Sequence, residues 1–241
     1  MDRRSVQHFV VILISLVIGF GLSKVPHELF SETGSVIAVV LIFIPALLSM
    51  VLGYQYRGFI AVLVLGLFAL GIESIGIATG FPYSFFEYTS DFGYLLLGTT
   101  PWTVAIAWSP LVIGSYLIAQ RYRGVKSLIL YLCLLVGTDL ALDPGAVARG
   151  LWEYQLTGVW YGIPVYNFLG WVFSGSIAYL ILKVLLVKKL SRESLVYLGS
   201  LSLVISIGLW TGASVGYGLL GPVVVGILLT TLTSYYLVVR S

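Results

Sequence analysis

Two aspartates, Asp139 and Asp143, stand four residues apart in one apolar stretch of the sequence, and Glu73 stands in another. Residues at i and i+4 of an α-helix project from one face, so the two aspartates should lie together. Two carboxylates in a poorly solvated place cannot both ionise easily, and one of them should keep its proton near neutral pH. A protonated carboxylic acid beside a carboxylate can act as a general acid paired with a general base.

Each acid also has a purely structural interpretation. Asp143 precedes Pro144 and could simply end a helix at the membrane interface, since proline constrains the residue before it. Asp139 could hold a neighbouring helix through a hydrogen bond. An ionisable residue inside an apolar span costs about 2.5–3.5 kcal/mol on insertion scales, so it normally faces the protein interior and has a purpose. We therefore take Asp139, Glu73 and Asp143 as candidate catalytic residues.

Aromatic residues are concentrated around these acids in the sequence. Most of them fit an interfacial belt, which is the usual place of Trp and Tyr in membrane proteins. As a group they could also shelter a passing positive charge, because desolvated aromatic faces stabilise cations by about 2 kcal/mol or more. Asn167 could orient water or a carboxylate, or it could cap a helix. The candidate substrate-binding residues are Tyr83, Trp108, Trp152, Tyr161, Asn167 and Trp171.

The composition indicates which kind of fold holds these residues in place. The chain is 59% hydrophobic and 10% charged, with a mean hydropathy of +1.03, whereas ordinary soluble domains are roughly 25% charged. We expect an all-α, polytopic membrane helical bundle that forms a single integral domain over residues 1–241, in the cell membrane. Hydropathy and helix breakers predict eight spans, over residues 5–23, 35–54, 58–79, 101–120, 125–142, 165–187, 195–211 and 218–239.

Basic residues predict the orientation. Eight spans return both termini to one side, and eleven of the thirteen Lys and Arg residues fall on that side, whereas only Lys24 and Arg149 fall on the other. The positive-inside rule then places both termini in the cytoplasm and the three candidate acids near the outer face. The basic residues are scattered and form no continuous stripe, so nucleic acid is not an expected partner.

Residues 73–108 and 139–171 have matching residue spacings, which indicate a possible parallel internal repeat. An acid precedes a Glu-Tyr pair by fourteen residues in both segments, and later a proline precedes a tryptophan by seven residues in both. The alternative is coincidence among common interfacial residues. The two outer connections, 80–100 and 143–164, are rich in aromatic residues, Gly and Pro, so we expect them to lie against the membrane or to fold into the mouth of the bundle.

Several motifs that bind cofactors are missing. The sequence has no aspartate-rich pair for magnesium-diphosphate, no glycine-rich dinucleotide loop and no histidine cluster for iron. His8 and His27 stand in separate segments, and Cys133 is the single cysteine. We therefore expect neither a metal site nor a cofactor.

The run from Asp139 to Trp152, followed by Tyr161-Gly162-Ile163-Pro164-Val165-Tyr166-Asn167-Phe168-Leu169-Gly170-Trp171, resembles the signature of the membrane-integral carotenoid biosynthesis proteins. That family includes carotenoid 1,2-hydratases. The stretch from Glu73 to Tyr83, with Pro101 and Trp108, resembles the family's other block, so the resemblance covers roughly residues 70–175.

The resemblance implies that water adds across a terminal isoprenoid C=C of an acyclic carotenoid such as lycopene, without redox change or cofactor. On this hypothesis Asp139 or Glu73 protonates the alkene, the aromatic residues shelter the tertiary cation, and Asp143 or its partner carboxylate deprotonates the attacking water. The expected partners are a long carotenoid or isoprenoid, membrane lipid and, as a further option, other carotenoid enzymes.

Two other functions fit the same residues. A cofactor-free carotenoid cyclase or isomerase would use the same acid and the same cation pocket but would exclude water. Alternatively, the chain could be a proton-coupled transporter or a lipid-binding membrane protein, since intramembrane acids and a repeat also suit transport. The predicted acids cluster near one face, however, whereas a transport path should mark the midplane of the bilayer.

Overall fold

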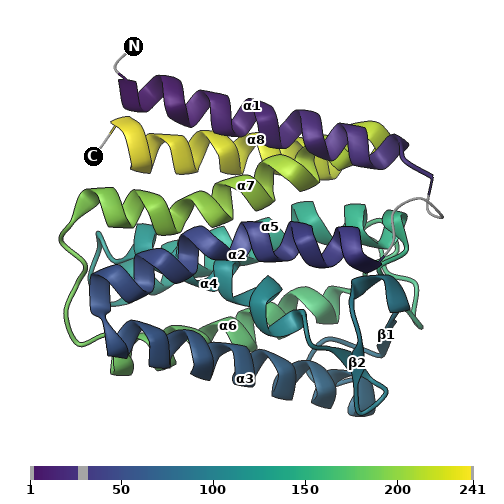
Figure 1. Ribbon diagram of the computed structural model, residues 1–241. Coiled ribbons are helices and arrows are strands. Elements are labelled where there is room, and N and C mark those ends of the chain that lie inside the picture. Colours follow the sequence, from purple (N-terminus) through teal and green to yellow (C-terminus); the bar gives the residue numbers. More distant parts are fainter. Residues whose placement is uncertain (1–2, 27–31, 240–241) are drawn as a thin grey trace.

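The computed structural model describes residues 3–26 and 32–239, and within them it is an all-helical bundle with short strands at one end (Figure 1). Seven of its helices are long and apolar enough to cross a membrane, so the protein is a multi-pass membrane protein. The described helices are α1 (Arg3–Lys24), α2 (Glu32–Tyr54), α3 (Tyr56–Thr79), α4 (Val104–Ala119), α5 (Val125–Arg149), α6 (Val165–Leu185), α7 (Glu193–Tyr217) and α8 (Leu220–Ser234), which continues as a π-helical turn, η3 (Tyr235–Val239).

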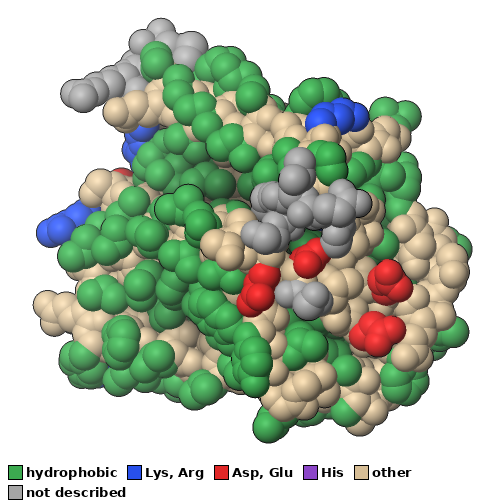
Figure 2. Space-filling model, turned by 45° about the vertical axis from the view of Figure 1, so that its right-hand side comes forward, with side chains coloured by type: hydrophobic (Ala, Val, Ile, Leu, Met, Phe, Trp, Pro, Cys, Tyr) green, Lys and Arg blue, Asp and Glu red, His purple; other side chains and the backbone are tan. Residues whose placement is uncertain are grey.

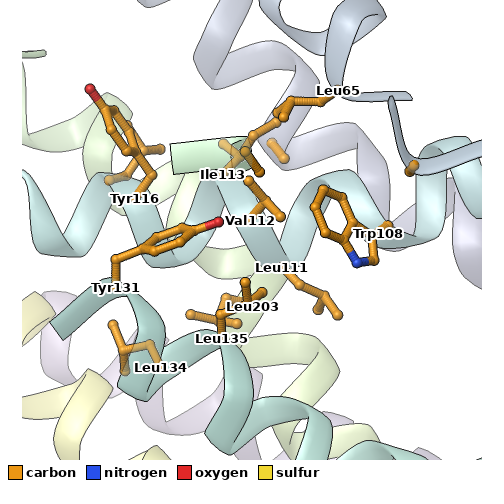
Figure 3. Packing of buried hydrophobic residues seen from close by; sticks show 14 of the residues in the cluster. Leu65, Trp108, Leu111, Val112, Ile113, Tyr116, Tyr131, Leu134, Leu135 and Leu203 are labelled. Atoms are coloured by element: carbon orange, nitrogen blue, oxygen red, sulfur yellow. The ribbon is translucent and has the colours of Figure 1, made fainter. Parts of the chain in front are cut away.

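Helix α4 is shorter than the span predicted for it. It has 16 residues and is about 24 Å long at about 1.5 Å per residue, less than the roughly 30 Å of a bilayer core. Its first predicted residues form strand β3 and a turn instead. Most of its side chains are buried, from Trp108 to Ala119, so α4 is an inner helix that its neighbours shield from lipid. Figure 3 shows this core, where the labelled α4 side chains lie between Leu65 of α3 and Tyr131, Leu134 and Leu135 of α5.

Helix α7 lies at the centre of the bundle and packs against α1, α2, α4, α5 and α8. Its contact with α1 depends on small residues spaced four apart. A Cβ atom on Gly208 would lie 2.8 Å from the Ser15 Cβ, and Cβ atoms on Gly212 and Gly216 would overlap α1 outright. Small residues at this spacing let two transmembrane helices approach closely enough for their backbones to touch. These glycines therefore allow α1 and α7 to pack in close contact.

Helix α5 continues beyond the point where the sequence analysis ends it. Residues 143–149 belong to the helix, so the prediction that the outer connection begins at residue 143 is wrong, and Asp143 does not end the helix. Pro144 has no N–H to donate to the carbonyl of Leu140 four residues earlier, which normally weakens a helix. Here the indole Nε1 of Trp160 donates to that carbonyl at 3.0 Å. The helix tolerates the proline because a side chain from the next connection replaces the missing donor.

The two outer connections fold into the mouth of the bundle. Strand β1 (Phe86–Tyr88) pairs antiparallel with β4 (Trp152–Tyr154), and Glu87 stands opposite Glu153. A 3₁₀ turn, η2 (Ser90–Phe92), and a second small pair, β2 (Leu95–Leu96) with β3 (Thr100–Pro101), complete the first connection.

Positions that the predicted repeat makes equivalent meet across this end of the bundle. Glu87 pairs with Glu153, and the rings of Trp108 and Trp171 lie 5.9 Å apart. When a two-fold axis relates two copies of a repeat, equivalent residues that lie near this axis contact each other. The repeat stays a prediction, and these contacts support it.

Both described ends of the chain lie at the end of the bundle opposite the strands (Figure 1). Figure 2 shows acidic side chains gathered on the strand end and an apolar surface along the helices; Glu32, Glu87 and Glu153 are the exposed acids of that end. His27, which the sequence analysis names, and Arg240, one of the eleven basic residues on the predicted cytoplasmic side, lie outside the described residues. The side of the membrane that each end faces stays a prediction.

Candidate active site

The three candidate acids lie together under the strand pair, each carried by a transmembrane helix. Glu73 is on α3, and Asp139 and Asp143 are on one face of α5, as their spacing predicts. All three are buried, with exposed fractions of 6%, 0% and 3% respectively. Asp143 interacts electrostatically with both Glu73 and Asp139. Two helices thus bring three carboxyl groups into one poorly solvated place.

Asn167 joins the two aspartates. It stands in the first turn of α6, and its amide Nδ2 donates to Asp139 Oδ2 at 2.9 Å and to Asp143 Oδ2 at 2.7 Å. Its side chain therefore orients carboxyl groups and does not cap the helix. The other oxygen of Asp139, Oδ1, is buried and has no hydrogen-bond partner among the described residues.

Two tyrosines of the strand pair each donate to one of the acids. The hydroxyl of Tyr154 on β4 donates to Asp143 Oδ2 at 2.8 Å, and that of Tyr88 on β1 donates to Glu73 Oε2 at 3.3 Å. Burial raises the pKa of both tyrosine hydroxyls well above their usual range, so they keep their protons and act as donors. The Trp152 side chain also interacts favourably with the Asp143 carboxylate. Of the three acids, Asp143 therefore has the most donors to stabilise a negative charge.

A cavity of about 150 Å³ opens beside these groups. Glu73, Asp143 and Asn167 line it, whereas Asp139 lies behind Asn167 and is not among its lining residues. Most of the remaining wall is apolar or aromatic. The aromatic lining residues on this side are Tyr83, Phe86, Tyr88, Phe92, Trp108, Trp152, Tyr154 and Trp171.

The aromatic wall is closely packed. Tyr88 stacks on Phe92 with ring centres 5.6 Å apart, and the Trp152 ring meets both of them edge-on. Tyr83 is 1% exposed and fits there because Gly76 and Gly170 leave room for its ring: a Cβ atom on either glycine would lie within 3 Å of it. The wall is therefore preformed, and its ring faces and edges surround the cavity beside the acids.

Five of the six residues predicted to bind substrate line this cavity, namely Tyr83, Trp108, Trp152, Asn167 and Trp171. Tyr161 does not line the cavity. This residue is 41% exposed, and its hydroxyl accepts a hydrogen bond from the backbone N–H of Gly221 at 2.8 Å, at the start of α8. Its position in the sequence motif does not reveal that the connection turns outward there.

The sequence analysis did not select Tyr88 and Tyr154 as site residues. A signal for them exists, since each follows an acid by fifteen residues: Tyr88 follows Glu73, and Tyr154 follows Asp139. The spacing alone does not show that the strands fold back over the acids. Within the described residues, no group of three or more His, Cys, Asp or Glu side chains is arranged to hold a metal ion.

Comparison with known proteins identifies the family of the chain. A family model described as "Carotenoid biosynthesis protein" matches residues 31–233. The chain is also 39% identical, over 131 residues, to the bisanhydrobacterioruberin hydratase of Haloarcula japonica. That alignment covers 52% of this chain and spans 44% of the length of the archaeal protein. No solved structure matches the chain. Because the family model matches well over half of its residues, the chain belongs to the carotenoid biosynthesis protein family.

Proposed function

We propose that this protein is a carotenoid 1,2-hydratase of the cell membrane, which adds water to the terminal C=C of an acyclic carotenoid by acid-catalysed carbocation chemistry. The observation that carries the proposal is the pairing of Glu73 and Asp143 on the wall of one aromatic cavity. Hydration needs a proton donor, a surrounding that tolerates a cation, and a base beside a water molecule. The name of the archaeal relative and the family membership agree with it.

The position of each acid supports a different role for it in the proposed reaction. Glu73 lines the cavity and has one hydrogen-bond donor, so it is the group that donates a proton to the CH carbon of the terminal C=C. The electron pair of the C=C forms the new C–H bond and leaves a tertiary cation on the neighbouring carbon. The faces of Trp108 and Trp171 stabilise this cation, by about 2 kcal/mol or more when water is excluded.

Asp143 acts as the base. Its carboxylate is held by Asn167, Tyr154 and Trp152 and takes a proton from the water molecule whose oxygen attacks the cation. The product is a tertiary alcohol, and the passage of one proton from Asp143 back to Glu73 restores the starting state. Asp139 does not line the cavity, so we assign it a positioning role, in which it fixes Asn167 from behind.

The polar part of the cavity favours hydration over cyclisation. A cyclase or isomerase must keep water away from the cation, whereas the polar residues Asp143, Asn167 and Tyr88 line this cavity. The carboxyl groups also lie at one end of the bundle, under the strand pair, which disfavours a transport path through its middle.

Expression in a lycopene-producing host tests the proposal. Mass spectrometry of the extracted pigments should show a product heavier by one water, because hydration adds water whereas cyclisation leaves the mass unchanged. Glu73→Gln and Asp143→Asn should each lower the yield by about 10²–10⁴-fold, the usual contribution of a general acid or base. The exposed Glu153→Gln serves as the matched control and should keep the activity. A product of unchanged mass, or full activity in both cavity variants, would contradict the assignment.

A further inference from the structure

The cavity continues past the carboxyl groups toward helices α1, α2 and α7. Its lining includes Ser23 near the end of α1, Ser35 and Ala38 in the first half of α2, and Trp210 in α7. In Figure 1, α1 and the Glu73-bearing α3 lie on opposite sides of the bundle. The cavity therefore crosses the interior of the bundle from the acids to a part of the wall that the proposed chemistry does not use.

The exposure of α7 side chains confirms the extent of this space. Helix α7 packs against five other helices, yet Leu209 and Trp210 in its middle are only half-buried. Both residues line the cavity. Part of the exposed surface of these two side chains therefore borders the cavity.

The far end of the cavity is lined by two helices that have little contact with each other. Helices α1 and α2 both pack on α7 but have little contact with each other, and residues of both helices line the cavity. Along α2, the half-buried lining residues Ala38 and Ile42 alternate with Ile37 and Leu41, which are 54% and 61% exposed on the membrane side. The part of the cavity wall formed by α1 and α2 thus consists of two helices that are not packed closely against each other.

The size of the cavity limits what it can enclose. Its volume is about 150 Å³, and an apolar cavity on the order of 150 Å³ holds one benzene-sized molecule. That is about the size of one five-carbon isoprene unit. The end group of a carotenoid fits beside the acids, but the rest of the polyene must leave the cavity.

We propose that the gap between α1 and α2 is a lateral binding site for the polyene chain, through which the substrate enters from the bilayer and in which its chain stays while its end group reacts. The lining residues that argue for this are small or aliphatic: Ser23, Ser35, Ala38, Val39 and Ile42. A flat polyene chain with short methyl branches meets only small or aliphatic side chains there and remains out of water. The inference rests on the proposed function for the position of the end group at Glu73 and Asp143.

A pair of neighbouring variants tests the site. Ala38→Trp fills the gap, whereas Ile37→Trp adds the same side chain on the lipid-facing side of α2. In liposomes containing lycopene, Ala38→Trp should lower the hydration rate by about tenfold or more, because the chain loses its apolar site. Ile37→Trp should keep the rate of the unmodified protein. Equal rates in the two variants would overturn the proposal.

A labelling experiment measures binding without catalysis and also decides the question if Ala38→Trp fails to fold. The single cysteine is first removed by Cys133→Ser, and Ala38→Cys or Ile37→Cys then supplies one thiol for N-ethylmaleimide. Lycopene in phosphatidylcholine liposomes should slow labelling of Ala38→Cys and leave Ile37→Cys unaffected. Equal labelling with and without lycopene would overturn the proposed site. Protection without any hydrated product would keep the binding site and refute the hydratase function instead.

Discussion

Replacement of Asn167 by leucine tests the arrangement of the acids most directly. Asn167→Leu keeps a side chain of similar size but removes the two donors that lie 2.9 Å from Asp139 and 2.7 Å from Asp143. A hydrogen bond to a charged group contributes about 1.5–3 kcal/mol. If only the bond to the Asp143 carboxylate supports the reaction, its loss should lower the turnover rate by about 10–100-fold, since about 1.4 kcal/mol corresponds to a factor of ten.

The assay is the turnover of lycopene by purified protein in liposomes, followed by mass spectrometry of the alcohol. Tyr166→Phe is a matched control, because Tyr166 precedes Asn167 on α6 and is 70% exposed. The unfolding temperature in detergent shows whether the Asn167→Leu protein is folded. A folded Asn167→Leu protein that retains more than about half of the normal rate would refute the reasoning, because a lost charge-stabilising hydrogen bond cannot leave the rate unchanged.

Two further predictions concern the tyrosine donors and the helix contact. Tyr154→Phe should lower turnover by about tenfold and Tyr88→Phe by less, since the first hydroxyl lies 2.8 Å from its carboxyl oxygen and the second lies 3.3 Å away; an equal or reversed order in the liposome assay would contradict this. Gly212→Leu should destabilise the protein by about 1–3 kcal/mol through overpacking against α1, measured by unfolding in detergent, whereas Gly21→Leu, at a position open to its surroundings, should have little effect.

The linear sequence determines the membrane bundle and the choice of acids. A mean hydropathy of +1.03 leaves no means of covering a soluble globule, and the long apolar runs then correspond closely to the helices. The i and i+4 spacing of Asp139 and Asp143 places them on one face of a helix, wherever that helix packs. These properties are local, so composition and periodicity are enough to predict them.

Tertiary packing determines which of the acids line the cavity and which residues bond to them. Asp139 and Asp143 have the same side chain and share one helical face, but Asp143 lines the cavity and Asp139 lies behind Asn167. The sequence does not show that the Trp160 indole donates to the Leu140 carbonyl, which Pro144 leaves without its usual donor. It also does not show that Tyr88 and Tyr154 donate to the carboxyl groups. Each of these contacts joins segments that only the packing of the helices brings together. Exposure to the cavity and hydrogen bonding between distant segments depend on the three-dimensional arrangement, and local periodicity carries no information about them.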